Sequence, residues 1–162
     1  MERHELTELH YITPIANVPS ILEKGILSHN RAKRVEHQSV VMNEIQDRRA
    51  KVTIPGGRRL REYVNLYICA RNPMMYKRQA QFKELCVLKI SPDVIDLPRV
   101  VVSDRNASSE YAIFKAAPGG LGIVNNPHDP VGVTTKHENI VNCGFDPEYK
   151  KFGSVENNRP NI

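Results

Sequence analysis

Basic residues are concentrated in the middle of this sequence, and arginine is the residue type there that could act on phosphates. Ten basic side chains and one acidic side chain, Glu62, lie between Arg48 and Lys83, which gives this segment +9 in a chain of net charge +5. An arginine guanidinium pairs with two phosphate oxygens at once and stays charged at any working pH. The segment is therefore typical of a phosphate-binding surface, and a solvated basic face without a partner is the alternative.

The sequence motifs of several common enzyme classes are absent. The chain has no Walker loop, no Gly-x-Gly-x-x-Gly, no His-Glu-x-x-His, no Cys-x-x-Cys pair and no nucleophile elbow. P-loop, Rossmann, common zinc and common hydrolase chemistries therefore have no support. The six histidines form no close pair on one predicted face, and we expect no metal site. The cysteines, Cys69, Cys86 and Cys143, are far apart in apolar surroundings and are expected to be reduced thiols.

Length and composition predict one domain that spans residues 1–162. A chain of 162 residues can bury a core without the help of a metal or a disulfide. The sequence contains no run of about 20 apolar residues, and its first residues lack the plan of a signal peptide. We therefore expect a cytoplasmic protein that does not contact a membrane, and we take it to be a monomer.

The pattern of apolar and turn residues predicts an α+β fold, because strands and helices do not alternate regularly. In the first predicted helix, Asn17 is the expected N-cap and Gly25 the expected C-terminal stop. The second predicted helix is expected to begin with Asn43 as its cap. Strands are predicted over 8–13, 63–69, 85–90, 99–103 and 111–115, and helices over 17–25 and 43–51. Beyond Gly120 the pattern weakens to a loop over 125–130 and a possible strand over 138–143.

Two blocks of the sequence carry polar residues where packing does not need them. The first block, residues 9–30, places Thr13 at a strand end and Asn17 at a helix start. The second block, residues 63–76, contains Asn72-Pro73-Met74 after an aromatic strand. In the simpler interpretation, each block is a core strand that leads into a structural turn.

These blocks, together with segments 45–50, 85–91 and 101–109, resemble the DarT family, whose members are toxins that ADP-ribosylate bases in single-stranded DNA using NAD⁺. The resemblance runs from about residue 8 to about residue 124. It implies an ADP-ribosyltransferase-like split β-sheet with short helices around an NAD⁺ cleft. Because the residues after Val124 do not follow the family pattern, we expect the C-terminal part, about 125–162, to be divergent or truncated.

The resemblance assigns residues to the NAD⁺ site. In the family, the first strand ends in a His-Ile-Thr-like triplet that holds the adenosine half of NAD⁺. Here the triplet reads Tyr11-Ile12-Thr13, and the histidine, His10, stands one residue early. Arg49 matches the catalytic arginine, and Arg48 is the alternative if the register is shifted. The other implied NAD⁺-binding residues are Asn17 and Gly25, in the turn and helix beside the pocket, and Tyr63 and Tyr67, at the nicotinamide end.

The resemblance also implies a DNA-binding face. The segment from Arg71 to Met74 matches a region near this face. A basic groove with aromatic residues suits single-stranded DNA, because unpaired bases stack on aromatic rings. The residues expected to bind DNA are Arg58, Arg59, Arg71, Asn72, Met74, Lys77 and Arg78.

The implied reaction needs a carboxylate, because breaking the nicotinamide–ribose bond gives an oxocarbenium-like centre. In the family a glutamate on a late strand fills this role. Glu138, which is followed by Asn139-Ile140-Val141, is the first candidate here, and Glu148 is the second. Arg49 and Glu138 are thus the expected catalytic residues.

The first hypothesis is therefore a mono-ADP-ribosyltransferase toxin that transfers ADP-ribose from NAD⁺ to thymidine or guanosine in single-stranded DNA. The alternative is a catalytically inactive module of the same fold that binds single-stranded nucleic acid or a nucleotide. A transferase that acts on RNA or protein is a third interpretation. The resemblance also implies a partner, a DarG-like macrodomain antitoxin that removes the modification.

Overall fold

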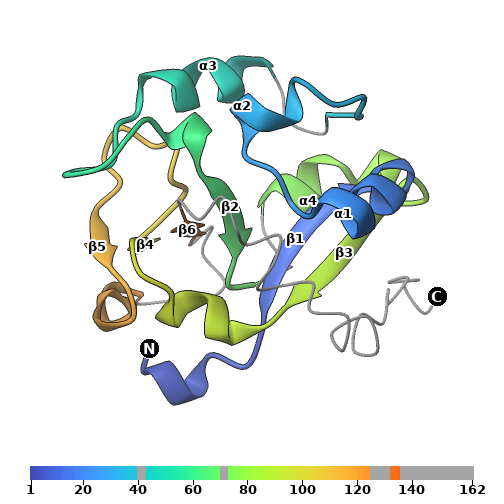
Figure 1. Ribbon diagram of the computed structural model, residues 1–162. Coiled ribbons are helices and arrows are strands. Elements are labelled where there is room, and N and C mark those ends of the chain that lie inside the picture. The colour runs from blue at the N-terminus through green and yellow to red at the C-terminus, as the bar shows by residue number, and fades with distance from the viewer. Residues whose placement is uncertain (40–42, 70–72, 125–131, 136–162) are drawn as a thin grey trace.

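The protein is built on an antiparallel sheet surrounded by short helices (Figure 1). The computed structural model describes residues 1–39, 43–69, 73–124 and 132–135. The strands are β1 (Leu9–Pro14), β2 (Val64–Tyr67), β3 (Leu85–Ile90), β4 (Val100–Ser103), β5 (Phe114–Ala116) and β6 (Gly132–Thr135). The α-helices in these ranges are α1 (Val18–Lys24), α2 (His29–Ala32), α3 (Asn43–Lys51) and α4 (Pro73–Lys77). Short 3-10 helices cover Arg3–Glu5, Ile15–Asn17, Leu60–Glu62, Gln79–Gln81, Pro92–Asp96 and Gly119–Ile123.

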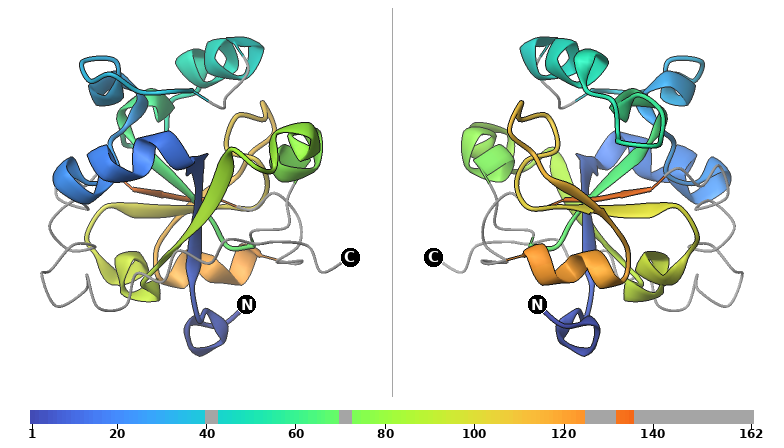
Figure 2. Two further views of the ribbon diagram at one scale, coloured as in Figure 1. Left: turned by 90° about the vertical axis from the view of Figure 1, so that its right-hand side faces the viewer. Right: turned by 90° about the vertical axis from the view of Figure 1, so that its left-hand side faces the viewer.

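The sheet has the strand order β3-β1-β2-β6-β4-β5, and every neighbouring pair is antiparallel. The α+β prediction is confirmed. Figure 2 shows that β1 crosses the strands of the other half of the sheet at a wide angle. Such a crossing is the accumulated right-handed twist of several strands.

The sheet is split between β1 and β2. Strand β1 pairs with β3 at six positions, but with β2 at a single position, where His10 faces Tyr67. Figure 1 shows the two strands close together at this point and spread apart at their other ends, toward α2 and α3. The spread opens a space lined by the backbone and side chains of both strands.

The larger hydrophobic core packs against one face of the sheet. Because strand side chains alternate between faces, Leu9 of β1, Leu66 of β2, and Val100 and Val102 of β4 point into this core, where each is at most 1% exposed. A second, smaller core lies on the opposite face. It contains the buried side chains of Ile54, Leu60, Tyr63 and Ala107, with Val101 and Phe114 packed against them.

Several sequence predictions of elements match the structure, and one is wrong at its start. Helix α3 has the predicted bounds, and β1, β3 and β4 agree within one residue. The strand predicted over 111–115 begins only at Phe114, because the preceding residues form a turn. In this turn the Tyr111 N–H donates to Ser109 Oγ and the Ala112 N–H donates to the Ser109 carbonyl. The pattern of the sequence did not predict the elements α2, α4 and β6. The loop predicted over 125–130 and the strand predicted over 138–143 lie outside the described residues.

The first helix forms as predicted, but the Asn17 side chain does not cap it. Gly25 ends α1 at φ 79°, and its N–H donates to the Ile21 carbonyl at 2.7 Å. This backbone conformation favours glycine, since it is strained for residues with a Cβ. Asn17 occupies the N-cap position, yet its side chain makes no capping hydrogen bond. The Asn17 amide is used elsewhere, at the candidate site.

Within the part of the chain that the structure describes, no helix has the length and apolar character that a membrane crossing requires. In the same part of the chain, neither Cys69 nor Cys86 is in a disulfide. Cys143 lies outside the described residues.

Candidate active site in the split of the sheet

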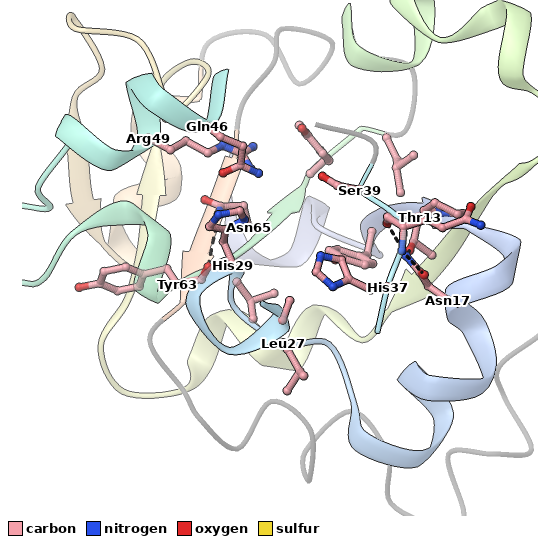
Figure 3. Close-up of a pocket in the computed structure, with 17 residues that line it drawn as sticks. Thr13, Asn17, Leu27, His29, His37, Ser39, Gln46, Arg49, Tyr63 and Asn65 are labelled. Carbon is pink, nitrogen blue, oxygen red and sulfur yellow. Dashed lines mark hydrogen bonds between the residues drawn. The ribbon is translucent and has the colours of Figure 1, made fainter. Parts of the chain in front are cut away.

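A cleft occupies the space where β1 and β2 diverge (Figure 3). One wall comes from the end of β1, another from the start of β2, and the rest from α2, α3 and the segment that follows α2. The residues that line it are mainly polar or aromatic. They include Tyr11, Ile12, Thr13, Asn17, His29, His37, Gln38, Ser39, Gln46, Arg49, Tyr63, Asn65 and Tyr67.

Helix α3 directs Gln46 and Arg49 into this cleft (Figure 3). The two residues are three positions apart, so they lie on the same face of the helix. Both carry a buried polar atom, Arg49 Nε and Gln46 Oε1, that has no hydrogen-bond partner among the described residues. Buried polar atoms are nearly always paired, because leaving one unpaired costs about 1–3 kcal/mol. An unpaired donor and an unpaired acceptor on one face of the helix therefore indicate a place prepared for a polar ligand.

Arg61 holds α3 in this orientation. Its Nε and Nη2 donate to the Gln46 carbonyl at 2.9 and 2.5 Å, and its Nη2 lies 3.6 Å from the Asp47 carboxylate. Charged donors bind a carbonyl more strongly than neutral ones. The contact ties the middle of α3 to the 3-10 helix before β2. The helix that carries Arg49 is thereby anchored next to β2, which forms another wall of the cleft.

Tyr11 lines the cleft together with Arg49, whose charge acts on its hydroxyl. Burial raises the pKa of Tyr11 above its ordinary value, the positive charge of Arg49 acts in the opposite direction, and Tyr67 adds a small further rise in the pKa. The phenol therefore stays neutral at working pH and can both donate and accept a hydrogen bond. The neighbouring residue His10 does not line the cleft. It is 7% exposed, and its Nε2 lies 3.0 Å from a carboxylate oxygen of Glu8.

Asn17 joins β1 to the segment after α2. Its Nδ2 donates to the Gln38 carbonyl at 2.8 Å and to Thr13 Oγ1 at 3.3 Å, and its Oδ1 accepts from the Gln38 N–H at 2.9 Å. The side-chain amide thus pairs with the Gln38 backbone on both its donor and its acceptor. Because Gln38 and His37 line the cleft, this clamp fixes the wall opposite α3.

Positive charge surrounds the side of the cleft that His29 occupies. The pKa of His29 is lowered by burial first, and then by the positive charges of Lys33, Arg61 and Arg49 and by the neighbouring His37. The positive charges among these causes disfavour a further positive charge and favour an anion. The electrostatics of the cleft therefore suit a phosphate or pyrophosphate.

Comparison with known proteins identifies the family. A family model described as "ssDNA thymidine ADP-ribosyltransferase, DarT" matches residues 10–127. The chain belongs to the DarT family. The matched residues thus include α3, the residues that line the cleft and the strands β2 to β5, but they end before β6 and Glu138.

Two curated proteins with similar sequences support this assignment. A DNA ADP-ribosyl transferase–DNA ADP-ribosyl glycohydrolase fusion protein of Thermosipho africanus is 40% identical over 114 residues, which cover 67% of this chain and 29% of that protein. A DNA ADP-ribosyl transferase of Thermus aquaticus is 31% identical over 119 residues, which cover 67% of this chain and 54% of that protein. The chain therefore spans only part of the length of the curated DarT relatives that it matches.

Solved DarT structures share the fold. Thermosipho africanus DarTG in complex with ADP-ribose superposes with a TM-score of 0.69 and 28% identity, over 80% of this chain and 40% of that one. Thermus sp. 2.9 DarT in complex with ADP-ribosylated ssDNA superposes with a TM-score of 0.66 and 24% identity, over 80% of this chain and 75% of that one. The expected ADP-ribosyltransferase-like fold is thereby confirmed.

Most residues that the DarT resemblance assigned to NAD⁺ meet in the cleft. Six of them come from β1, α3, β2 and the start of α1, and they line one cavity: Tyr11, Ile12, Thr13, Asn17, Arg49 and Tyr67. Gly25 lines a smaller neighbouring cavity, which shares Tyr11, Thr13 and Asn17 with the cleft. Arg48, the alternative to Arg49, does not line the cleft and contributes to a separate cavity.

Tyr63 is placed differently from the other aromatic candidate. Its ring is turned away from the cavity (Figure 3) and packs in the smaller core, where the residue is 3% exposed. Its hydroxyl accepts a hydrogen bond from the Arg58 backbone N–H at 3.1 Å. Tyr63 therefore contributes its backbone to the cleft, and Tyr67 is the aromatic candidate that remains for stacking beside a ligand.

The basic residues expected to bind DNA fall into two groups. Arg58 and Arg59 lie in the turn after α3, whereas Lys77 and Arg78 lie at the end of α4, on the opposite side of the molecule in Figure 1. Met74 belongs to α4. The remaining candidates, Arg71 and Asn72 for DNA and Glu138 and Glu148 for catalysis, lie outside the described residues.

Six polar residues of the cleft were not predicted from the sequence: His29, His37, Gln38, Ser39, Gln46 and Asn65. Helical spacing was a usable signal for Gln46, because it stands three residues before Arg49. No local pattern marks the two histidines, since α2 and the Asn17 clamp bring them to the cleft. Among the described residues, no group of three or more His, Cys, Asp or Glu side chains is arranged to hold a metal ion.

Proposed function

We propose that this protein transfers ADP-ribose from NAD⁺ to thymidine in single-stranded DNA. The observation that carries the proposal is the buried, unpaired guanidinium nitrogen of Arg49 in the cleft of the split sheet. Arg49 stands at the position that matches the catalytic arginine of the DarT family. The reaction exchanges one glycosidic bond for another, so the enzyme is a glycosyltransferase.

The residues of the cleft suit the parts of NAD⁺. The Arg49 guanidinium and the positive field around His29 favour the pyrophosphate. Gln46 Oε1 is an acceptor and needs a donor, which phosphates lack and ribose hydroxyls supply. The end of β1, with Thr13 beside Asn17, is proposed to hold the adenosine half. Tyr67 is proposed to flank the nicotinamide.

The proposed step breaks the bond between the ribose C1′ and the nicotinamide nitrogen, and neutral nicotinamide leaves with the bonding electrons. Arg49 holds the pyrophosphate and so fixes the position of the ribose. We assign the carboxylate that stabilises the oxocarbenium-like sugar to Glu138. Thymine N3 attacks C1′ and loses its proton to that carboxylate. N3 takes part in base pairing in duplex DNA, which is why the substrate must be single-stranded.

We place this activity in the cytoplasm, because bacterial NAD⁺ and DNA share that compartment, and we propose that the protein acts as a monomer without contacting a membrane. A DarG-like macrodomain protein is the proposed partner. The Thermosipho africanus relative, a fusion of a transferase with a glycohydrolase, supports this pairing. Light scattering of the purified protein tests the monomer.

Mass spectrometry of oligonucleotides tests the proposed function. The protein is incubated with NAD⁺ and single strands that contain either thymidine or guanosine as the only modifiable base. We expect one ADP-ribose mass on the thymidine strand, and none on the same strand in a duplex. Arg49→Lys should abolish the adduct, whereas Arg48→Lys should retain it, because Arg48 does not line the cleft and lysine keeps its positive charge.

The carboxylate is tested in the same assay. Glu138→Gln should abolish the adduct while single-strand binding is retained, and Glu148→Gln is the matched control. Loss of activity in Glu148→Gln alone would transfer the role to that residue. Single-strand binding by the unmodified protein with no adduct on either base would identify the inactive binding module instead.

A further inference from the structure

A second cavity of about 510 Å³ lies on the other flank of α3. Its walls are the outer side of α3, the turn that follows it, and the loop before β5. The residues that give it chemical character are Arg48, Lys51, Thr53, Ser109, Glu110 and Phe114. None of them belongs to the cleft described above.

Positive charge dominates one wall of this cavity. Arg48 and Lys51 are three residues apart on one face of α3, and both are exposed. Neither has an ion-pair partner within the ranges that the structure describes. Arg59, in the turn that completes this wall, is joined to Thr53 by a β-bridge. Glu110 is the one acidic residue among those that line the cavity.

The opposite wall offers an aromatic surface and hydroxyl groups. Phe114, at the start of β5, is half-buried and lines the cavity. Ser109 lines it as well, and its Oγ accepts from the N–H of Tyr111, whose own side chain is 77% exposed. Cations for phosphates together with aromatic rings for bases are the combination by which proteins bind single strands.

Helix α3 connects this cavity to the cleft. Residues 46 and 49 face the cleft, whereas residues 48 and 51 face the second cavity. A strand whose target base enters the cleft can leave it over α3, because this helix forms one of the walls. The second cavity lies on the far flank of α3, and its positive charge has the sign that a phosphodiester chain requires.

We propose that this cavity binds the nucleotides next to the target base on one side of it, with their phosphates at Arg48 and Lys51 and a base against Phe114. The inference rests on the proposed function, because it takes single-stranded DNA as the substrate. It adds a subsite that determines DNA affinity and leaves NAD⁺ binding untouched.

Fluorescence anisotropy with single strands of 10–12 nucleotides tests the subsite independently of catalysis. Arg48→Gln and Lys51→Gln together should weaken DNA binding at least about tenfold, and the dependence of log K on log salt should fall by up to about 0.7 for each lost phosphate contact. Lys24→Gln, an exposed residue of α1, is the control for a lost charge. Glu110→Gln should act in the opposite direction and tighten binding, since it removes a like charge.

Strands extended on only one side of the target base locate the subsite. The loss in the double variant should be found with strands that extend in one direction, 5′ or 3′, and should be absent with strands that extend in the other. Equal loss in both directions would overturn the proposal, because it would indicate a general electrostatic effect. Unchanged DNA binding in the double variant, or no tightening in Glu110→Gln, would overturn it as well.

Two measurements separate this inference from the proposed function. The NAD⁺ affinity of the double variant, measured by calorimetry, should equal that of the unmodified protein, and a weaker NAD⁺ affinity would overturn the subsite. If the unmodified protein forms no DNA adduct, the proposed function fails, but the anisotropy results still decide the subsite. Tighter binding of an RNA strand of the same sequence would reject DNA as its occupant.

Discussion

Arg49 and Gln46 show how a single helical face can present both a donor and an acceptor to a ligand. Their buried atoms are unpaired among the described residues, so the protein carries an energetic cost at this site in the absence of ligand. Removing such a group should therefore stabilise the fold and weaken the function. Stability exchanged for function is the usual signature of a binding site.

Gln46→Met removes the unpaired oxygen and keeps the volume of the side chain. We expect the free energy of unfolding to rise by about 1 kcal/mol in urea denaturation, because a buried unpaired acceptor is lost. The KM for NAD⁺ should rise several-fold at the same time. The Arg61 contact should survive, since it uses the backbone carbonyl of Gln46. A less stable variant with unchanged KM would mean that Gln46 is structural.

His29 predicts a pH dependence of stability. Its folded pKa lies below the ordinary value of 6.5, so the unfolded chain binds a proton that the folded chain resists. The stability linked to His29 is therefore present above about pH 6.5 and is lost as the pH falls toward the folded pKa. In His29→Gln this loss should disappear, and the difference between the two urea midpoints measured from pH 7.5 to pH 5 isolates it. Parallel curves would contradict the assignment.

Short elements hold the cleft together through a few specific contacts. Arg61 anchors α3 from the 3-10 helix before β2, and Asn17 anchors the segment after α2 from the start of α1. Helices as short as α2, with four residues, have little stability of their own and depend on such contacts. The walls of the cleft therefore keep their positions only as long as these hydrogen bonds are intact.

Asn17→Ala should release the wall that contains Gln38. It removes two hydrogen bonds to the Gln38 backbone, so we expect unfolding to become easier by about 1–2 kcal/mol and the KM for NAD⁺ to rise more than kcat falls. Faster hydrogen exchange of the Gln38 amide would report the release directly. Asn106→Ala removes comparable hydrogen bonds to Ser108, away from the cleft, and should leave this KM unchanged. Equal effects of the two variants on KM would refute the clamp.

Strand β6 holds the two halves of the sheet together. It comes last among the described strands yet lies in the middle of the sheet. It pairs with β2 on one side and with β4 on the other, and so joins the half that contains β1 to the half that contains β5. The positive segment is also divided by the fold. The turn after α3, which contains Arg58, and helix α4, which ends at Lys77, lie on opposite sides of the molecule in Figure 1.

Toxicity tests the complete reaction in a cell. Overproduction of the unmodified protein in bacteria without a partner glycohydrolase should arrest growth, because ADP-ribosylated thymidine cannot form normal base pairs. Arg49→Ala, produced at the same level, should permit growth. Co-production of a DNA ADP-ribosyl glycohydrolase should restore growth of the unmodified strain. Equal growth of both strains without that enzyme would count against DNA modification.

The sequence by itself determined the local features of this protein. Helix α3, strands β1, β3 and β4, and the glycine that ends α1 follow from side-chain periodicity and turn chemistry, which act over a few residues. The family motifs also identified Arg49, which the structure places in the cleft. Gln46 was within reach of the same helical spacing.

Only the tertiary structure decided how these elements meet. The amide of Asn17 could cap its own helix or bind Gln38, 21 residues later, and no local pattern distinguishes the two. The ring of Tyr63 could flank a ligand or fill the smaller core, and in the structure it packs in the core with Leu60. The pairing of β6 between β2 and β4 depends on contacts between residues far apart in the chain. Such contacts leave no periodic trace in the sequence, because their energy arises only when the distant surfaces are brought together.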